Sequence, residues 1–132
     1  VKITDRISSA IPPWPVSLLG QIAAVEALAD PGYYKRMYRK THSLRSEMVK
    51  KLRKLPSLKV YGSCANFFLA ELENAPIGAE ELVRRLARKK IYIRGYKGFG
   101  NSFGGRFVRI AVKGKNSNGL IIKELGKILA GH

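Results

Sequence analysis

The chain has 132 residues, 45% of them hydrophobic, and carries 25 lysines and arginines against 9 aspartates and glutamates, for a formal net charge of +16. This length suits a single domain, no apolar run approaches the roughly 20 residues of a membrane span, and the basic charge points to an anionic partner, nucleic acid being the first class to consider. The single cysteine, Cys64, excludes an internal disulfide and favours a reducing compartment such as the cytoplasm, and the two histidines, His42 and His132, have no neighbour at a metal-ligand spacing, so we expect no zinc-type site.

The chain begins with a proline-rich segment. Pro12, Pro13 and Pro15 favour an extended, polyproline-like backbone, so we expect residues 1–16 to form an extended lead-in. Ser17 is placed to cap a helix over residues 18–28. Since that helix is apolar on almost every side, it should be covered on more than one face.

A second, longer helix is expected from Asp30 and Pro31, a cap and first-turn proline pair, to about Leu55. Its buried stripe consists of residues spaced by three or four, namely Tyr34, Tyr38, Thr41, Leu44, Met48, Leu52 and Leu55. Its other faces carry nine cations against a lone acid, Glu47, and these are Lys35, Arg36, Arg39, Lys40, Arg45, Lys50, Lys51, Arg53 and Lys54. We expect the cations to form a solvent-exposed face, with a docking surface as the alternative.

Two strands should follow Pro56, which ends the second helix. We expect them at residues 59–61 and 66–72, separated by Gly62 and Ser63. Cys64 lies at their junction, where it is expected to be a small packed residue, since no histidine with a supporting acid accompanies it as a nucleophile would require.

Two further helices complete the predicted elements. The first runs from Glu80 to Lys90, with i,i+4 ion pairs Glu80/Arg84 and Glu81/Arg85 and a buried stripe of Leu82, Val83, Leu86 and Ala87. The second is capped by Asn116 or Ser117 and buries Leu120, Ile121, Leu125, Ile128 and Leu129. The order α, α, β, β, α, β, β, α describes an α+β fold, in which helices pack mainly on one face of a small mixed or antiparallel sheet.

The stretch from Ile91 to Val112 contains two short apolar segments, IYIR and FVRIAV, each with one arginine. The two-residue period of a strand places Arg109 on the face opposite Val108 and Ile110. A partly buried guanidinium needs an anionic partner. That partner is either an internal carboxylate or a ligand anion, and the scarcity of acids in the chain favours the ligand.

The glycine-rich loop over residues 95–105 joins these two strands. Its sequence GFGNSFG does not match the phosphate-binding pattern G-x-G-x-x-G, and a strand follows it where a helix would be needed, so we reject a nucleotide loop. Residues 97–100, KGFG, match only the first half of an RNA-recognition signature. A basic RNA-binding module and a ligand-free interaction domain therefore stay as alternatives.

Four segments taken together resemble a known family. They are PPWPVSLLGQIAAVEAL, the helix containing YY and TH.LR, VYGSCANFFLAEL, and IYIR followed by FVRIAV. In this order they are similar to the C-terminal small domain of class I/II pyridoxal-phosphate-dependent aminotransferases, in the branch that contains histidinol-phosphate aminotransferase and threonine-phosphate decarboxylase. The similarity covers nearly the whole chain, which makes it more specific than any single motif above.

The resemblance implies roles for both arginines. Arg109 matches the family arginine that binds the substrate α-carboxylate bidentately, and Arg94 matches the arginine that contacts the phosphate or other distal anion of the substrate. The implied substrate is a small anionic amino compound, and the implied reaction is amino-group transfer in amino-acid biosynthesis. Pro15 stands where many members have asparagine after the aromatic residue, so no polar contact is carried over there.

The resemblance also implies what this chain lacks. Residues 1–16 would lead in from a missing large domain, and residues 17–132 would form the small domain. The cofactor, pyridoxal 5'-phosphate, would be attached to that large domain, because no stretch here matches the family's Schiff-base lysine, phosphate cup or pyridine-nitrogen acid. We expect the chain to be inactive alone and the intact enzyme to be a cytoplasmic homodimer, with neither membrane nor nucleic acid as a partner. Transaminase and decarboxylase activities are not distinguished.

Overall fold

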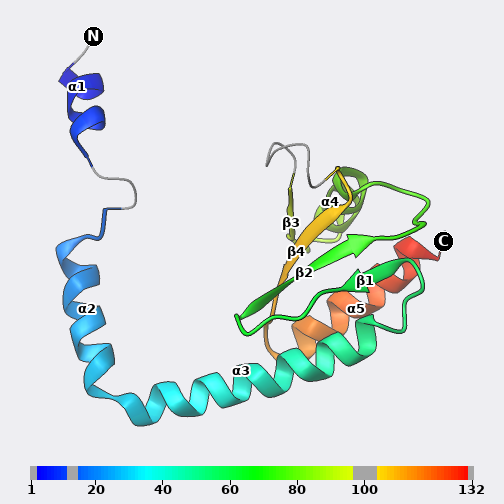
Figure 1. The fold of residues 1–132 in the computed structure, drawn as a ribbon, viewed down its shortest axis with the longest axis horizontal. Helices are drawn as coiled ribbons and strands as arrows, with labels where there is room; N and C mark the ends of the chain where they lie inside the picture. The colour runs from blue at the N-terminus through cyan, green and yellow to red at the C-terminus, as the bar shows by residue number, and fades with distance from the viewer. Residues whose placement is uncertain (1–2, 12–14, 97–103, 131–132) are drawn as a thin grey trace. The chain divides into compact units, whose positions relative to one another are not determined.

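A computed structural model describes residues 3–11, 15–96 and 104–130 of the chain (Figure 1). Its elements are α1 (Ile3–Ala10), α2 (Leu18–Ala29), α3 (Pro31–Leu52), β1 (Leu58–Val60), β2 (Phe67–Leu72), α4 (Ala79–Arg88), β3 (Arg94–Gly95), β4 (Phe107–Ala111) and α5 (Lys115–Leu129). The chain divides into two compact units, residues 1–37 and 38–132, which are described separately. Pro12, Pro13 and Trp14 lie outside the described residues.

The first unit contains α1, α2 and the beginning of α3. The helix α1 corrects the expectation of an extended backbone at its position, although the proposed lead-in over 1–16 remains untested as a domain boundary. The cap of α2 is as predicted, since the Ser17 hydroxyl accepts a hydrogen bond from the Gly20 backbone N–H at 3.2 Å. None of the α2 residues is buried, and Leu19 and Leu28 are 79% and 82% exposed. The described residues of the first unit therefore do not supply the apolar cover that the sequence of α2 requires.

The long helix α3 begins as predicted, because the Asp30 carboxylate accepts a hydrogen bond from the Tyr33 backbone N–H at 2.9 Å. It ends at Leu52, before the predicted Leu55. Only the second half of the predicted stripe is buried, with Met48 and Leu52 fully enclosed and Tyr38 exposed. This half belongs to the second unit, where α3 packs into the core.

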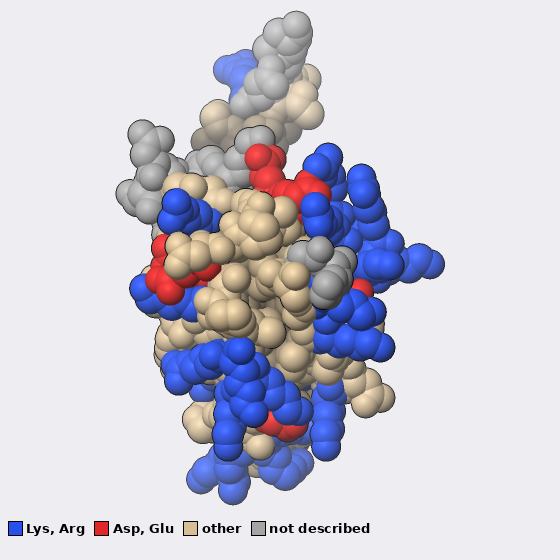
Figure 2. All heavy atoms as spheres, turned by 90° about the vertical axis from the view of Figure 1, so that its right-hand side faces the viewer, with Lys and Arg blue, Asp and Glu red and all other residues tan. Residues whose placement is uncertain are grey.

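Arg45 corrects the prediction that all cations of α3 face solvent. It is only 9% exposed, and its Nη1 donates hydrogen bonds to the backbone carbonyls of Cys64 at 3.0 Å and Ala65 at 2.7 Å. Arg45 thus fixes the segment before β2 onto α3. The other predicted cations of α3 are exposed, as expected. Lysine and arginine side chains cover much of the face seen in Figure 2.

The sheet of the second unit has four antiparallel strands in the order β1-β2-β4-β3. The predicted alternation in β4 is confirmed, since Val108 and Ile110 are fully buried and Arg109 lies on the other face, partly exposed. Of the predicted strand IYIR, only Arg94 and the following Gly95 pair with β4. The long central pair β2–β4 therefore holds the sheet together, and β3 forms a short edge.

One hydrophobic core lies between the sheet and the helices α3, α4 and α5. In the view of Figure 1, α4 and α5 lie behind the strands and α3 runs below them. Its largest fully buried side chains come from both layers and are Phe68, Met48, Leu52, Leu82, Leu86, Ile110, Leu125 and Val108. The predicted α+β fold with helices packed mainly on one face of the sheet is thus confirmed.

Three local predictions are wrong. Helix α5 begins at Lys115 after Gly114, so neither Asn116 nor Ser117 caps it. The Asn118 side chain instead holds the residue before the helix, accepting a hydrogen bond from the Lys113 N–H at 2.8 Å and donating one to the Lys113 carbonyl at 2.9 Å. Leu120 is 49% exposed instead of buried. Cys64 is exposed and not packed, since the interior partner of this segment is its carbonyl oxygen, held by Arg45.

Candidate functional site

The two predicted site arginines lie directly opposite each other on neighbouring strands. Arg94 of β3 pairs in register with Arg109 of β4. Directly opposed residues of an antiparallel pair have Cβ atoms about 4.5–5.5 Å apart and project to the same face. That face is the one away from the helices, because Val108 and Ile110, the residues that flank Arg109, are buried toward them. The sheet therefore presents two guanidinium groups on its open face.

Arg109 contacts an aromatic ring. Its guanidinium carbon lies 4.8 Å from the centre of the Phe67 ring, within the range of a cation–π interaction. Phe67 belongs to β2, where it pairs with Ala111, and Leu69 stands opposite Arg109. Sequence reasoning missed Phe67, although the strand period in FFLAEL could have placed it on the open face once the register was known.

No described carboxylate lies within ion-pair distance of Arg109. The internal ion pair considered for Arg109 is therefore absent from the part of the chain that the structure describes. Two like charges placed opposite each other in a sheet are destabilising unless something compensates them. A bound anion would supply that compensation, and the planar guanidinium suits carboxylate and phosphate.

The glycine-rich loop is described only at its two ends, residues 95–96 and 104–105. Lys97, Phe99 and the rest of the tested RNA signature lie outside the described residues, so that alternative stays a prediction. Gly104 and Gly105 have positive φ values of 51° and 68°, which non-glycine residues rarely adopt. The Gly105 carbonyl accepts a hydrogen bond from the Ala79 backbone N–H at 2.9 Å. The loop therefore enters β4 through a turn attached to the beginning of α4.

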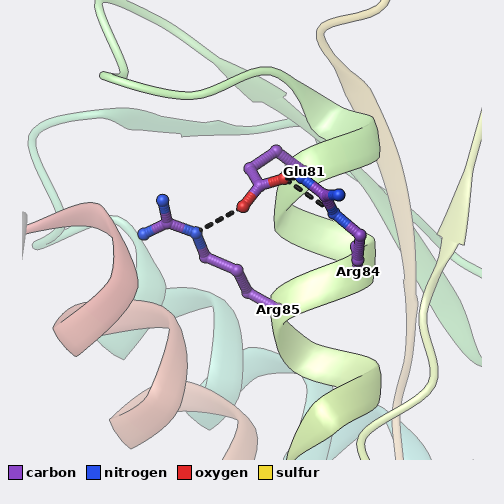
Figure 3. A network of polar contacts seen from close by, with 3 residues as sticks. All are labelled: Glu81, Arg84 and Arg85. Carbon is purple, nitrogen blue, oxygen red and sulfur yellow. Dashed lines mark hydrogen bonds and ion pairs between the residues drawn. The ribbon is translucent and has the colours of Figure 1, made fainter.

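A polar network on α4 lies apart from the two site arginines. Glu81 accepts hydrogen bonds from both Arg84 and Arg85, the latter at 2.7 Å (Figure 3). The pair Glu81/Arg85 was predicted, whereas Arg84 bonds Glu81 and not the predicted Glu80 in the interactions that the structure shows. Hydrogen bonds first from Arg85 and then from Arg84 lower the pKa of the Glu81 carboxyl to about 2.

This lowered pKa predicts an acid-dependent stability. Since the folded-state pKa of Glu81 is about 2 and its ordinary value is 4.5, the ionised carboxylate stabilises the fold fully above pH 4.5, and this contribution is lost as the pH falls toward 2. The urea midpoint of the wild-type chain should exceed that of Glu81→Gln at pH 6, and the two should converge near pH 2. Glu26→Gln, which removes an exposed carboxylate that has no ion pair with a described residue, is the control. A gap between wild type and Glu81→Gln that persists at pH 2 would contradict this role of the charge.

The described residues offer no evident place for a carbonyl cofactor bound through lysine. Such a lysine needs a partly desolvated site that lowers its pKa, yet every described lysine is exposed. His42 lines a surface pocket between α3 and the segment after β1, with Arg45, Ser46 and Tyr61 among its neighbours, and His132 lies outside the described residues. Within the described ranges no group of three metal-ligating side chains occurs, and no helix is long and apolar enough to cross a membrane.

Comparisons with known proteins agree with the resemblance seen in the sequence. A family model described as Aminotransferase class I and II matches residues 2–120. The chain is 32% identical over 128 residues to histidinol-phosphate aminotransferase of Clostridium kluyveri, covering 95% of this chain and 34% of that protein. It is 30% identical over 122 residues to threonine-phosphate decarboxylase of Salmonella typhimurium, covering 90% and 32%. The chain thus spans about a third of the length of these curated relatives.

Solved structures show the same fold. The histidinol-phosphate aminotransferase of Clostridium acetobutylicum superposes with a TM-score of 0.73 at 26% identity, over 96% of this chain and 37% of that one. The L-threonine-O-3-phosphate decarboxylase of Porphyromonas gingivalis gives a TM-score of 0.66 at 28% identity, over 92% and 36%. The α+β fold is therefore that of a part of the fold type I pyridoxal-phosphate enzymes.

Proposed function

The chain belongs to the class I and II aminotransferase family, whose members are pyridoxal-phosphate-dependent enzymes, and we propose that it is the substrate-recognition part of a histidinol-phosphate aminotransferase-like enzyme. In this proposal the chain is a C-terminal small domain over residues 17–132, preceded by a lead-in over 1–16. The activity is that of a larger enzyme, because the relatives are about three times as long as the matched region.

The observation that carries the proposal is the register between Arg94 and Arg109. Arg109 binds the substrate α-carboxylate with two parallel hydrogen bonds, and Arg94 binds a phosphate at the other end of the substrate. Two features support these roles. The guanidinium groups share the open face of the sheet, and no described carboxylate neutralises Arg109. The names of the two relatives, histidinol-phosphate aminotransferase and threonine-phosphate decarboxylase, each contain a phosphorylated compound.

The cofactor belongs elsewhere in the enzyme. Because every described lysine is exposed, these residues do not fit a cofactor-bearing lysine, and we assign that lysine, the phosphate cup and the acid beside the pyridine nitrogen to a large domain. The exposed apolar helix α2 supports this assignment, since its sequence requires apolar cover that the first unit does not give. We further propose that the complete enzyme is a cytoplasmic homodimer.

A phosphothreonine-type decarboxylase is the second candidate. The Salmonella typhimurium relative and the Porphyromonas gingivalis structure favour it, at 30% and 28% identity. Both candidates need a carboxylate clamp and a phosphate contact, so the arginine roles are common to them. They differ in whether the substrate carboxylate is retained or released as carbon dioxide.

The test compares the 132-residue chain with the full-length enzyme that contains it. The chain alone should show no activity and, after borohydride reduction with limiting cofactor, no preferential labelling of one lysine. The full-length enzyme should convert a phosphorylated amino substrate with 2-oxoglutarate to glutamate without releasing carbon dioxide. Stoichiometric labelling of a single lysine in the chain alone would contradict the division of roles, and release of carbon dioxide without glutamate would select the decarboxylase.

A further inference from the structure

The second unit carries far more positive charge than its own acids can neutralise. Residues 38–132 contain 21 lysines and arginines but only 6 glutamates and no aspartate. Five of these glutamates already form ion pairs with nearby lysines or arginines, and the sixth, Glu80, also has an interaction partner. Lysines and arginines therefore outnumber the acids of this unit by 15.

Many of the lysines and arginines of the second unit lie on the helical layer. We define the cationic helix surface as Lys50 and Lys51 at the end of α3, Arg53 and Lys54 just after it, Lys89 after α4, and Lys115, Lys123 and Lys127 of α5, all of which are exposed. Lys51 and Lys127 also form ion pairs, with Glu47 and Glu124. Figure 2 shows lysine and arginine side chains spread over the lower and right-hand parts of one face, with a few acids between them.

Two observations place cations from different helices beside each other at the two ends of α5. Lys51 of α3 and Lys115 of α5 line the same surface pocket between the two helices. At the other end of α5, Lys127 donates a hydrogen bond to Glu124 at 2.9 Å, and Lys89 and Lys123 are near enough to help lower the pKa of that carboxyl. With a rise of 1.5 Å per residue, the distance along α5 from Lys115 to Lys127 is about 18 Å.

This length and charge match a nucleic-acid backbone. One strand of a duplex has about 3.4 Å of helix axis per phosphate, and a single strand with stacked bases keeps a similar rise, so 18 Å corresponds to roughly five phosphates. A membrane surface fits less well. Helices that lie in a membrane interface bury an apolar face in the lipid, whereas the apolar stripes of α3, α4 and α5 are buried in the core, with Leu120 as an exception.

We propose that the cationic helix surface binds the phosphate backbone of single-stranded nucleic acid, independently of base sequence. The proposal goes beyond the enzymatic function and does not depend on Arg94 or Arg109. It assigns the excess charge to a second activity of the domain, on the face of the fold opposite the substrate arginines. Its contacts are electrostatic, so affinity should fall steeply with salt.

The experiment measures binding of a fluorescent 20-nucleotide RNA of mixed sequence to the full-length enzyme by anisotropy, between 50 and 200 mM salt. With roughly five phosphates neutralised, the logarithm of the binding constant should fall with the logarithm of salt concentration with a slope of about −3.5. The double variant Lys115→Gln/Lys123→Gln removes two cations that have no ion pair with a described acid. Its slope should be less steep by about 1.4, since each single-strand phosphate contact contributes about 0.7.

The matched control is Lys59→Gln/Arg106→Gln, which removes the same charge from β1 and from the residue before β4. Its slope should equal that of the wild type, and both double variants should keep wild-type enzyme activity. If the slope became less steep by the same amount in both double variants, the net charge of the protein, and not this surface, would be responsible for RNA binding. Absence of binding at 50 mM salt, or binding to vesicles with anionic lipid but not to RNA, would also overturn the proposal.

Discussion

Replacing Arg109 by glutamine in the full-length enzyme should lower kcat/KM for the amino substrate by roughly 30- to 3,000-fold, because truncating one partner of a buried, hydrogen-bonded charge pair costs about 2–5 kcal/mol. The guanidinium lies on the open sheet face against the Phe67 ring, and among the described residues it has no carboxylate partner. Its removal should therefore affect the bound substrate much more than the fold. The measurement is steady-state kinetics with the natural amino donor, together with the urea midpoint.

Two controls separate a carboxylate clamp from a general effect of charge. Arg109→Lys keeps the charge but loses the bidentate geometry, so its kcat/KM should lie between those of the wild type and Arg109→Gln. Arg106→Gln removes an exposed cation three residues earlier and should leave the kinetics unchanged. Cofactor absorbance should be the same in all variants. Wild-type kinetics in Arg109→Gln would remove this residue from the substrate site.

The buried faces of the elements could be predicted from the sequence because they follow local periods. Alternation in FVRIAV places Val108 and Ile110 inside and Arg109 outside, as found. Ser17 and Asp30 likewise cap their helices by accepting hydrogen bonds from backbone N–H groups three residues further along. Both caps could therefore be predicted from residues close together in the sequence. Predictions of this kind need no knowledge of how distant segments meet.

The register and the long-range polar contacts could not be predicted. The sequence predicts that both strands exist, but not that Arg94 lies opposite Arg109, because this register depends on how two strands pair across a long loop. From the sequence, Arg45 was predicted to be one of the surface cations of α3, but it donates hydrogen bonds to backbone carbonyls 19 and 20 residues away. Backbone acceptors carry no sequence signal, so both the burial of Arg45 and the exposure of Cys64 were missed for the same physical reason.

The apolar side chains of α2 and of the second unit differ in burial, and this difference supports the proposal that a large domain completes the enzyme. The second unit encloses most of its large apolar side chains in one core, whereas Leu18, Ile22 and Val25 of α2 are each more than half exposed. At about 25 cal/mol for each Å² of apolar surface removed from water, covering such a helix would contribute several kcal/mol. A large domain that supplies this cover would stabilise the first unit and bring the cofactor to the sheet arginines.

Replacing Arg94 by glutamine should produce a loss that depends on the substrate. A hydrogen bond to a charged group contributes about 1.5–3 kcal/mol, so kcat/KM should fall roughly 10- to 150-fold for a phosphorylated amino substrate. For the same substrate without its phosphate, the wild type and the variant should be equal, because the contact is absent in both. Arg94→Lys, which keeps a point charge, should recover part of the loss with the phosphorylated substrate.

Unfolding should not account for this loss. Arg94 is exposed on the short edge strand β3, where removing its charge relieves the repulsion with the like-charged Arg109 but also removes the interaction that Arg94 makes. The urea midpoint of Arg94→Gln should therefore lie close to that of the wild type. The decisive quantity is the ratio of kcat/KM for the phosphorylated and dephosphorylated substrates, measured in both enzymes. An equal fall for the two substrates would place the phosphate contact on another residue, while a fall confined to the phosphorylated one would assign it to Arg94.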